Sequence, residues 1–294
     1  MQIDINTKFV TLIGAPLAQS FAARMQNAAY DAAGINMRYF YNEAGTEHLE
    51  QIIDGIRHMP AFVGAAVTKP NKTAVLQYLD DLDPLCRRMG ACNTIVKDSA
   101  GRLIGYNTDG LGFARTLELD AKVDPQGKSF FCIGAGGVAR PICALLAHSG
   151  AKKVYVTDIY PESAAQLVAD INASFLPVAE HAVFGDFSAA DDCDVIINAS
   201  GVGMGITLGT SPIPADHIHP GQFCFDACYN PRRTQFLLNA QERGARVMNG
   251  LYMSLYQGMA QFELWCGKRA PQDAMLAELV AAVNEMRDEE VAPR

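Results

Sequence analysis

The sequence has no dense basic patch and no long apolar run. Its 294 residues include 24 Lys and Arg against 32 Asp and Glu, for a net charge of −8. The basic residues are scattered, so we expect no face that could neutralise nucleic-acid phosphates. No apolar run reaches ~18 residues, so no membrane span is predicted. Neither nucleic acid nor a membrane is therefore an expected partner.

A secretory signal and a metal-binding cysteine pattern are also missing. The first ten residues lack the basic stretch and apolar core of a signal peptide. The eight cysteines have no zinc-site spacing, and several lie inside apolar runs, as Cys132, Cys143 and Cys224 do. We therefore expect buried thiols, no metal site and a cytoplasmic protein.

Short apolar runs alternate with amphipathic segments along most of the chain. Strands are predicted at 8–14, 37–42, 61–68, 128–134, 152–158, 194–200, 222–227 and 245–250, with a helix at 20–34 and two more after residue 250. The polar segment 119–128 reads as a linker or a helix-to-strand crossover. Such alternation predicts an α/β fold, and the length suits two domains.

A glycine-rich stretch follows the predicted strand 128–134 and precedes a helix. Gly134, Gly136 and Ala139 fit the pattern G-x-G-x-x-G/A of a dinucleotide-binding turn. Glycines there permit a tight turn and let the backbone approach a pyrophosphate at the helix N-terminus. A glycine-rich turn without a ligand is the alternative interpretation.

The next predicted strand ends in Asp158, 24 residues after Gly134. A carboxylate there would bind the ribose hydroxyls of NAD and repel the 2′-phosphate of NADP. No Arg stands among the following Ile159, Tyr160 and Pro161. We therefore predict a preference for NAD over NADP. Asp158 as the cap of the helix near Pro161 is the other interpretation.

Two further stretches carry groups suited to proton transfer. Lys72 lies in "VTKPNK" and Asp109 in "GYNTDG". Oxidation of an alcohol needs a group that takes the hydroxyl proton, and a lysine oriented by a carboxylate can do so. Taken singly, Lys72 could be a solvated surface charge and Asp109 a helix cap.

Together these stretches resemble the shikimate/quinate dehydrogenase family. Eight motifs occur in the family's order: "IGAPLAQSFAARMQN", "VTKPNK", "GACNT", "NTDG", "GAGGVAR", "NASGVGM", "DACYNPRRT" and "GLYMSLYQ". The resemblance implies an α/β substrate domain at 1–108, completed by C-terminal helices within 250–294. It also implies a doubly wound Rossmann-type NAD(P)-binding domain at 109–249.

The resemblance further implies roles for individual residues. Lys72 would be the catalytic acid/base and Asp109 its partner. Contacts to substrate would come from Ser20, Thr68, Lys72, Asn93, Asp109, Tyr229 and Gln257, with Ser20 and Tyr229 at the carboxylate end. Contacts to the cofactor would come from Gly134, Ala135, Gly136, Gly137, Val138, Ala139, Asp158, Ile159, Ala199, Ser200, Met204, Ala227 and Gly250.

The chain departs from the family pattern near Ser20. Ala22 stands where the family has a second hydroxyl residue, Ala23 where it has Pro, and Ala66 where it has Asn. A hydrogen bond to a charged group contributes roughly 1.5–3 kcal/mol, so Ala22 alone would weaken carboxylate binding. Ser20 could also serve only as the cap of the helix at 20–34.

The sequence therefore predicts an NAD-dependent oxidoreductase that acts on a ring hydroxyl of shikimate or a similar cyclic hydroxy acid. Quinate, or a different substrate within the family, is the alternative. A non-catalytic NAD-binding regulatory protein is the reading from another functional class. The partner is a small molecule, and the chain is expected to be a monomer or a homodimer.

Overall fold

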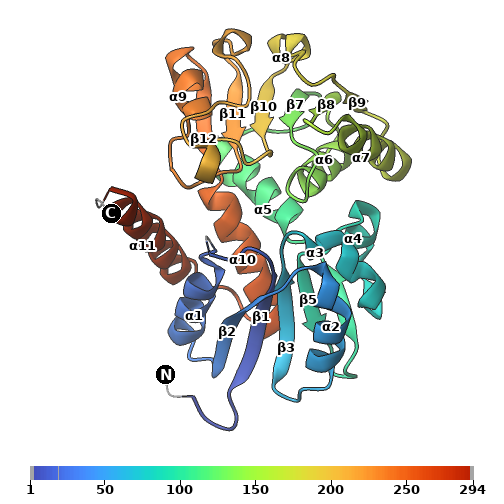
Figure 1. Cartoon of the computed structure of the whole chain (residues 1–294), viewed down its shortest axis with the longest axis vertical. Helices are drawn as coiled ribbons and strands as arrows, with labels where there is room; N and C mark the ends of the chain where they lie inside the picture. The colour runs from blue at the N-terminus through green and yellow to red at the C-terminus, as the bar shows by residue number, and fades with distance from the viewer. Residues whose placement is uncertain (1–2, 19, 292–294) are drawn as a thin grey trace. The chain divides into compact units, whose positions relative to one another are not determined.

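The computed structural model describes residues 3–18 and 20–291, with side chains up to residue 285. The chain forms two compact units, each coloured by residue number in Figure 1. The first comprises Met1–Gly112 and Leu255–Arg294, and the second comprises Phe113–Ser254. The domain boundaries implied by the sequence, after residues 108 and 249, lie a few residues before these divisions.

The first unit contains a mixed sheet of order β2-β1-β3-β5-β6-β4. β1 pairs in parallel with β2 and β3, whereas β5 pairs antiparallel with β3 and β6. The buried side chains of β1 and β3 belong to the apolar runs that the sequence marks as strands. The strands are β1 Lys8–Gly14, β2 Met37–Glu43, β3 Phe62–Val67, β4 Asp81–Leu82, β5 Thr94–Lys97 and β6 Leu103–Tyr106.

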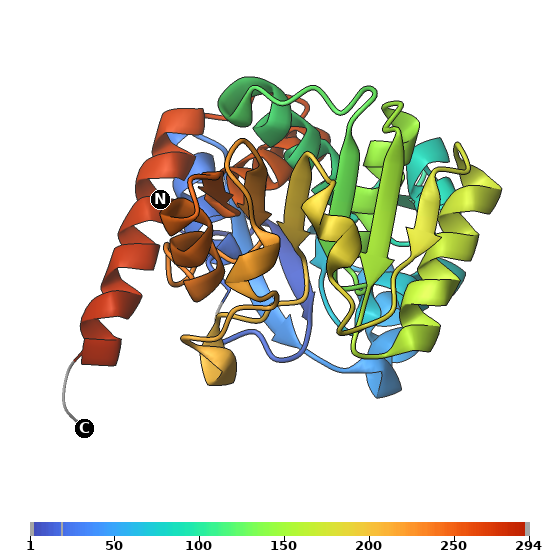
Figure 2. The same ribbon diagram turned by 90° about the horizontal axis from the view of Figure 1, so that it is seen from above.

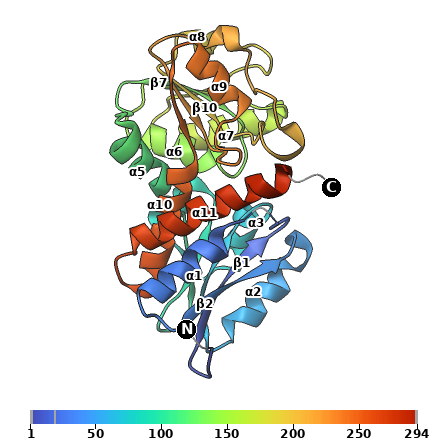
Figure 3. The ribbon, with the colours of Figure 1, turned by 90° about the vertical axis from the view of Figure 1, so that its left-hand side faces the viewer.

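Helices pack on this sheet, and α1 runs beside the C-terminal helix α11 (Figure 3). On the other side, Leu49, Ile53 and Ile56 of α2 join the core formed by β1, β3 and β5. The helices are α1 Ala22–Ala32, η1 Thr46–His48, α2 Leu49–Arg57, α3 Asn71–Ala74, η2 Val75–Tyr78, α4 Pro84–Met89, α5 Asp109–Arg115, α10 Leu251–Cys266 and α11 Gln272–Val291. The chain passes between the two units within α5 and within α10.

The second unit contains a parallel sheet of order β12-β11-β10-β7-β8-β9. Figure 2 shows α7 lying along β8 and β9. The strands are β7 Ser129–Ile133, β8 Lys153–Thr157, β9 Ala179–His181, β10 Val195–Asn198, β11 Phe223–Asp226 and β12 Arg246–Asn249. The helices are η3 Thr116–Ala121, α6 Ala139–His148, α7 Pro161–Ser174, α8 Ser188–Asp191, η4 Gly205–Thr207, η5 Ala215–His217 and α9 Gln235–Glu242.

Helices cover both faces of this second sheet. Phe131 of β7 packs in a core with residues of α8 and α9, such as Ala190 and Phe236. The next residue, Cys132, faces the other way and contacts Cys143 of α6. Alternate residues of a strand point to opposite faces, so the buried part of β7, Phe130–Ile133, is apolar at successive positions. The predicted α/β fold with a doubly wound second domain is confirmed.

One local expectation needs correction, and the structure decides between the two alternatives for a second segment. The first helix spans Ala22–Ala32 instead of 20–34, because Phe21 occupies the N-cap position. The segment 119–128 does not link the two units. It is the helix-to-strand crossover inside the second unit, where η3 ends at Ala121 and β7 begins at Ser129.

Candidate active site

Lys72 and Asp109 form an ion pair in the first unit. Lys72 Nζ lies 2.6 Å from Asp109 Oδ2, and the two side chains are only 13% and 11% exposed. Lys72 belongs to the short helix α3, which follows β3, and Asp109 is the first residue of α5. Neither is a solvated surface charge. A lysine and a carboxylate held together with little water around them are suited to controlled proton transfer.

Asn107 keeps the Asp109 carboxylate available for Lys72. The side-chain oxygen of Asn107 accepts hydrogen bonds from the backbone N–H groups of Asp109, at 3.1 Å, and Gly110, at 3.4 Å. Its amide donates to Ala91 O, which anchors it in the core. Asn107 therefore binds the first two N–H groups of α5, and Asp109 is the first residue of that helix. The motif "NTDG" contains Asn107, but the sequence analysis did not select it.

Asn93 is buried, and most of the hydrogen-bonding groups of its side-chain amide already have partners in the protein. Its Oδ1 accepts from Thr94 Oγ1 and Thr108 N, both at 2.8 Å, and its Nδ2 donates to Thr108 Oγ1 at 2.9 Å. Gln261 of α10 donates to Thr94 Oγ1 at 3.1 Å. This network ties α10 to the edge of β5. Within the described part of the chain, the second N–H of the Asn93 amide has no acceptor.

Two further predicted substrate residues belong to the same unit. Thr68 directly follows β3 and precedes Lys72 by one turn, and its hydroxyl has no partner within residues 3–18 and 20–291. Gln257 lies on α10 and is half-buried. The first unit thus contains every predicted substrate residue except Tyr229, which follows β11 in the second unit.

Ser20 lies just before α1 and binds the first N–H group of the helix. Its hydroxyl oxygen accepts a hydrogen bond from the backbone N–H of Ala22, at 3.3 Å, whereas Phe21 at the N-cap position makes no side-chain capping bond. Ser20 is half-buried. The predicted capping bond is therefore present, although Ser20 lies one residue before the N-cap position.

In the second unit, the glycine loop has the geometry that the fingerprint predicts. Gly134 has φ +110°, and a Cβ there would lie 2.7–2.8 Å from backbone atoms of Ala199 and Ser200. Only glycine suits this position, because it tolerates both the positive φ and the close approach. The backbone N–H groups of Gly136 and Gly137 have no hydrogen-bond partner among the described residues, and space is open at Gly136.

The other predicted cofactor residues gather at the carboxyl ends of neighbouring strands. Ala199 and Ser200 follow β10, next to the glycine loop that follows β7. Ala227 follows β11 and Gly250 follows β12, and a Cβ on Gly250 would overlap the Ala227 carbonyl oxygen. In parallel sheets this edge is the usual place of a nucleotide ligand.

Asp158 binds its own glycine loop. Its Oδ2 accepts from Ala135 N at 2.7 Å, and its Oδ1 accepts from Tyr160 N at 2.9 Å. The N-cap residue of α7 is Tyr160, so the alternative in which Asp158 caps that helix is wrong. The Ala135 N–H is thereby taken and does not face a ligand.

The remaining predicted cofactor residues occupy the same edge of the sheet. Gly137 and Val138 lead into α6, and Ala139 begins it and is fully buried. Ile159 is 61% exposed directly after Asp158. Met204 is half-buried in the loop after β10, where its Cε would contact a Cβ placed on Gly201.

A buried carboxylate that the sequence analysis did not select supports these loops. Asp226, fully buried at the end of β11, accepts from Asn198 Nδ2 and Cys228 N at 2.9 Å and from Thr234 Oγ1 at 2.5 Å. Burial raises the pKa of Asp226, and these hydrogen bonds oppose the rise. Asp226 therefore joins the end of β10 to the loop that follows β11. The only signal in the sequence was its place in "DACYNPRRT".

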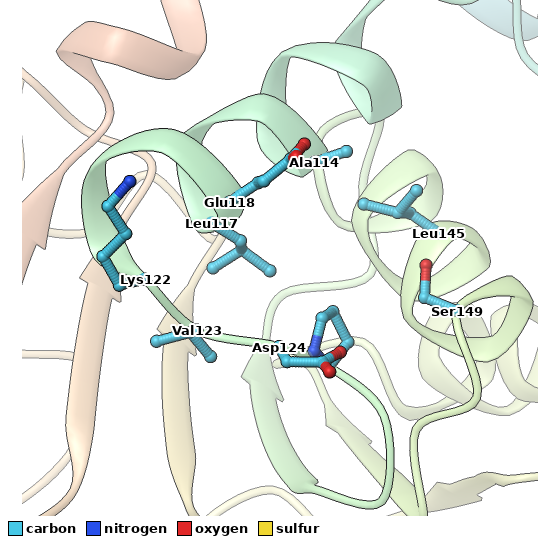
Figure 4. A pocket seen from close by; sticks show the side chains of 9 residues that line it. Ala114, Leu117, Glu118, Lys122, Val123, Asp124, Leu145 and Ser149 are labelled. Atoms are coloured by element: carbon cyan, nitrogen blue, oxygen red, sulfur yellow. The ribbon is translucent and has the colours of Figure 1, made fainter.

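A cavity of about 510 Å³ lies elsewhere in the second unit (Figure 4). Leu117 and Leu145 form part of its apolar wall, and Glu118, Lys122 and Asp124 stand around it. None of the predicted site residues lines it. It therefore has no part in the candidate active site.

The described residues contain no group of three or more His, Cys, Asp or Glu placed to hold a metal ion. Cys132, Cys143 and Cys224 are buried free thiols, as predicted. Among the helices of the described part of the chain, none is long and apolar enough to cross a membrane.

Comparison with known proteins identifies the family to which the sequence motifs point. Residues 12–95 match the family model "Shikimate dehydrogenase substrate binding domain", and residues 250–280 match "Shikimate 5'-dehydrogenase C-terminal domain". The shikimate dehydrogenase (NADP(+)) of Moorella thermoacetica is 39% identical over 96% of this chain and 97% of the relative.

Two solved structures share the fold. Shikimate 5-dehydrogenase from Listeria monocytogenes, in complex with shikimate and NAD, has a TM-score of 0.88 and 33% identity, covering 95% of this chain and 98% of that one. The 5-ketofructose reductase of a Gluconobacter species has a TM-score of 0.85 and 30% identity, covering 95% and 99%. Together with the eight motifs, these similarities establish that the chain belongs to the shikimate dehydrogenase family.

Proposed function

We propose that this protein catalyses the NAD(P)-dependent interconversion of shikimate and its 3-dehydro ketone. The observation that carries the proposal is the Lys72–Asp109 pair, at 2.6 Å and largely buried. Its position in a member of this family supports a proton-transfer role. A binding protein without turnover would have no use for such a pair, which argues against the regulatory alternative.

The proton and the hydride leave the substrate by different routes. A bound nicotinamide cofactor would supply the acceptor for the hydride on the carbon that carries the reacting hydroxyl. Neutral Lys72 takes the hydroxyl proton at Nζ, and Asp109 holds the amine in place. In the reverse reaction the Lys72 ammonium returns a proton to the ketone oxygen.

Other side chains would hold the substrate in register with Lys72. Thr68 offers a hydroxyl without a partner in the described chain, and Asn93 offers its remaining N–H. We assign both to ring hydroxyls and Gln257 to the ring face reached from α10. Ser20 and Tyr229 would bind the carboxylate. Ala22 and Ala66 offer no polar group, so this end has fewer donors than the family pattern.

The second unit offers a suitable cradle for the cofactor's pyrophosphate. The N–H groups of Gly136 and Gly137 lie before α6 without partners in residues 3–18 and 20–291, as an anion at a helix N-terminus requires. Val138 and Ala139 continue this turn, and Ala199, Ser200, Met204, Ala227 and Gly250 would border the cofactor's two ends.

The choice between NAD and NADP rests on Asp158. Its negative charge, and the lack of a basic residue at Ile159, Tyr160 or Pro161, favour NAD. The expectation of an NAD preference has no support in the name of the Moorella relative, which points to NADP, whereas the Listeria structure holds NAD. We keep the preference for NAD as a proposal that depends on this carboxylate alone.

A second candidate function has one observation in its favour. The reduced number of donors around Ser20 would suit a substrate that lacks a carboxylate, and one structural relative is a 5-ketofructose reductase. Quinate is a third possibility, because its ring carries the same reacting hydroxyl.

An initial-rate assay of NAD(P)H formation at pH 9 tests the proposal. Shikimate, quinate and a neutral polyol should each be supplied with NAD and with NADP. We expect the highest kcat/KM with shikimate. A higher value with another substrate would replace shikimate, and cofactor binding without turnover of any would favour the regulatory protein.

A further inference from the structure

The segment before α1 is held by two side chains of strand β2. Glu43 Oε2 accepts from Leu17 N at 3.1 Å. Tyr41 Oη donates to the Ser20 carbonyl at 2.5 Å and accepts from the Ala23 N–H at 3.3 Å. Tyr41 and Glu43 are two residues apart, so they project from the same face of β2. Figure 3 shows α1 and β2 side by side.

The start of α1 needs such outside partners. The first N–H groups of a helix have no acceptor within it. Phe21 supplies no capping side chain, and Ser20 Oγ accepts from the Ala22 N–H, so the next N–H group, that of Ala23, needs another acceptor. The family pattern has a proline at position 23, and proline restricts φ and has no N–H. With Ala23 the backbone is less restricted and carries an N–H group. Tyr41 supplies the acceptor for that N–H and a restraint on both sides of Ala22.

We infer that Tyr41 is a positioning residue of the substrate site. Ser20 N donates to Leu17 O at 2.9 Å and Ser20 O accepts from Tyr41, so both backbone groups of Ser20 are fixed. This arrangement sets the direction of the Ser20 hydroxyl. A phenol has a single proton, and Tyr41 gives it to Ser20 O, so Tyr41 acts through Ser20. The inference rests on the proposed function, in which Ser20 binds the substrate carboxylate.

The neighbouring Tyr39 provides a matched control. It lies two residues earlier on the same face of β2, and its ring contacts that of Tyr41 at a centroid distance of 6.5 Å. Its hydroxyl is buried and has no hydrogen-bond partner among the described residues. Tyr39→Phe removes the same atom from the same surface without removing a hydrogen bond.

Kinetics of four variants test the inference: Tyr41→Phe, Tyr39→Phe, Ala23→Pro and the double variant Tyr41→Phe/Ala23→Pro. We expect Tyr41→Phe to raise KM for shikimate about tenfold, with kcat and the cofactor KM within about twofold of wild type. Tyr39→Phe should match wild type. Proline should restore KM in the double variant to within about threefold, because it restrains the backbone without needing an acceptor.

Several results would overturn the inference. An unchanged KM in Tyr41→Phe would do so, and so would an equal rise in Tyr39→Phe. A lower Tm with unchanged KM would mean that the phenol only stabilises the helix start. Failure of proline to rescue KM would show that the phenol acts in another way. If wild type does not turn over shikimate, the proposed function itself fails. If wild type turns over shikimate and Tyr41→Phe leaves KM unchanged, only the inference about Tyr41 fails.

Discussion

The two units build their parts of the candidate site from different chemical material. In the first unit, side chains from separate elements meet: Lys72 of α3, Asp109 of α5 and Asn93 beside β5. In the second unit, the site consists mainly of backbone at the ends of parallel strands, and Gly134 lies close to the backbone of Ala199. Proton transfer needs particular functional groups, whereas a pyrophosphate needs N–H groups and close approach. Catalysis should therefore be lost when a functional group is removed from the first unit. Cofactor binding should be lost when a methyl group is added to the glycine loop of the second unit.

The largest effect should come from removing the amine of the first unit. Lys72→Ala should lower kcat about 10³-fold, because general acid–base catalysis typically contributes 10²–10⁴-fold. Cofactor affinity, measured by calorimetry, should change less than about threefold. The control is Lys8→Ala, which removes an exposed lysine at the start of β1. Equal losses in kcat and cofactor affinity would contradict the assignment of Lys72.

The corresponding change in the second unit adds one methyl. Gly134→Ala should weaken cofactor binding about 10- to 100-fold, because φ +110° and contact with the Ala199 backbone strain any Cβ. Shikimate affinity in the absence of cofactor should not change. Gly221→Ala is the control, because Gly221 has φ +90° but open space around its Cβ position. If both variants lose cofactor affinity equally, general destabilisation is the cause.

A smaller effect should follow from neutralising the carboxylate beside the glycine loop. Asp158→Asn keeps an oxygen for the Ala135 N–H and removes the charge that, under the proposed NAD preference, would repel a 2′-phosphate. The ratio of kcat/KM for NADP to that for NAD should rise about tenfold. Asp216→Asn, at an exposed position of the same unit, should leave this ratio unchanged. An unchanged ratio in Asp158→Asn would remove the basis for NAD preference.

The smallest effect concerns the pH dependence of stability. Burial raises the pKa of Asp226 in the folded protein, so this group favours folding most at pH values below its unfolded pKa. That contribution is lost as pH rises through the raised folded pKa. The free energy of unfolding of wild type, relative to Asp226→Asn, should therefore decrease as pH rises from about 3 to 7. Denaturant unfolding of both proteins at several pH values measures it, and a constant or rising difference would contradict the prediction.

Much of the fold could be predicted because it depends on nearby residues. β1 was predicted at 8–14 and occurs at Lys8–Gly14, since a buried parallel strand requires a continuous apolar run. The glycine loop was equally predictable, because its strand, turn and helix follow each other directly. The short strands β4 and β9 were not predicted, because two or three residues are too few to form a pattern.

The details of the site were less predictable. Position alone offered Ser20, Asp158 and Asp109 as helix caps. In the structure Ser20 accepts from the Ala22 N–H, but the Ala23 N–H binds the distant Tyr41, and the Asp109 N–H binds Asn107. A side chain chooses among the acceptors and donors that packing brings within reach, and local spacing does not contain that choice.

The sequence by itself determined the α/β fold, the dinucleotide-binding turn and, through eight motifs, the family. These features are carried by residues within a few positions of one another, so backbone sterics and local periodicity suffice. Only the tertiary structure decided that Lys72 meets Asp109 across 37 positions, that Asp226 is buried, and that Tyr41 holds Ser20. Those contacts exist because the order of strands in each sheet brings distant ends of the chain together, and sheet order is a property of the whole fold.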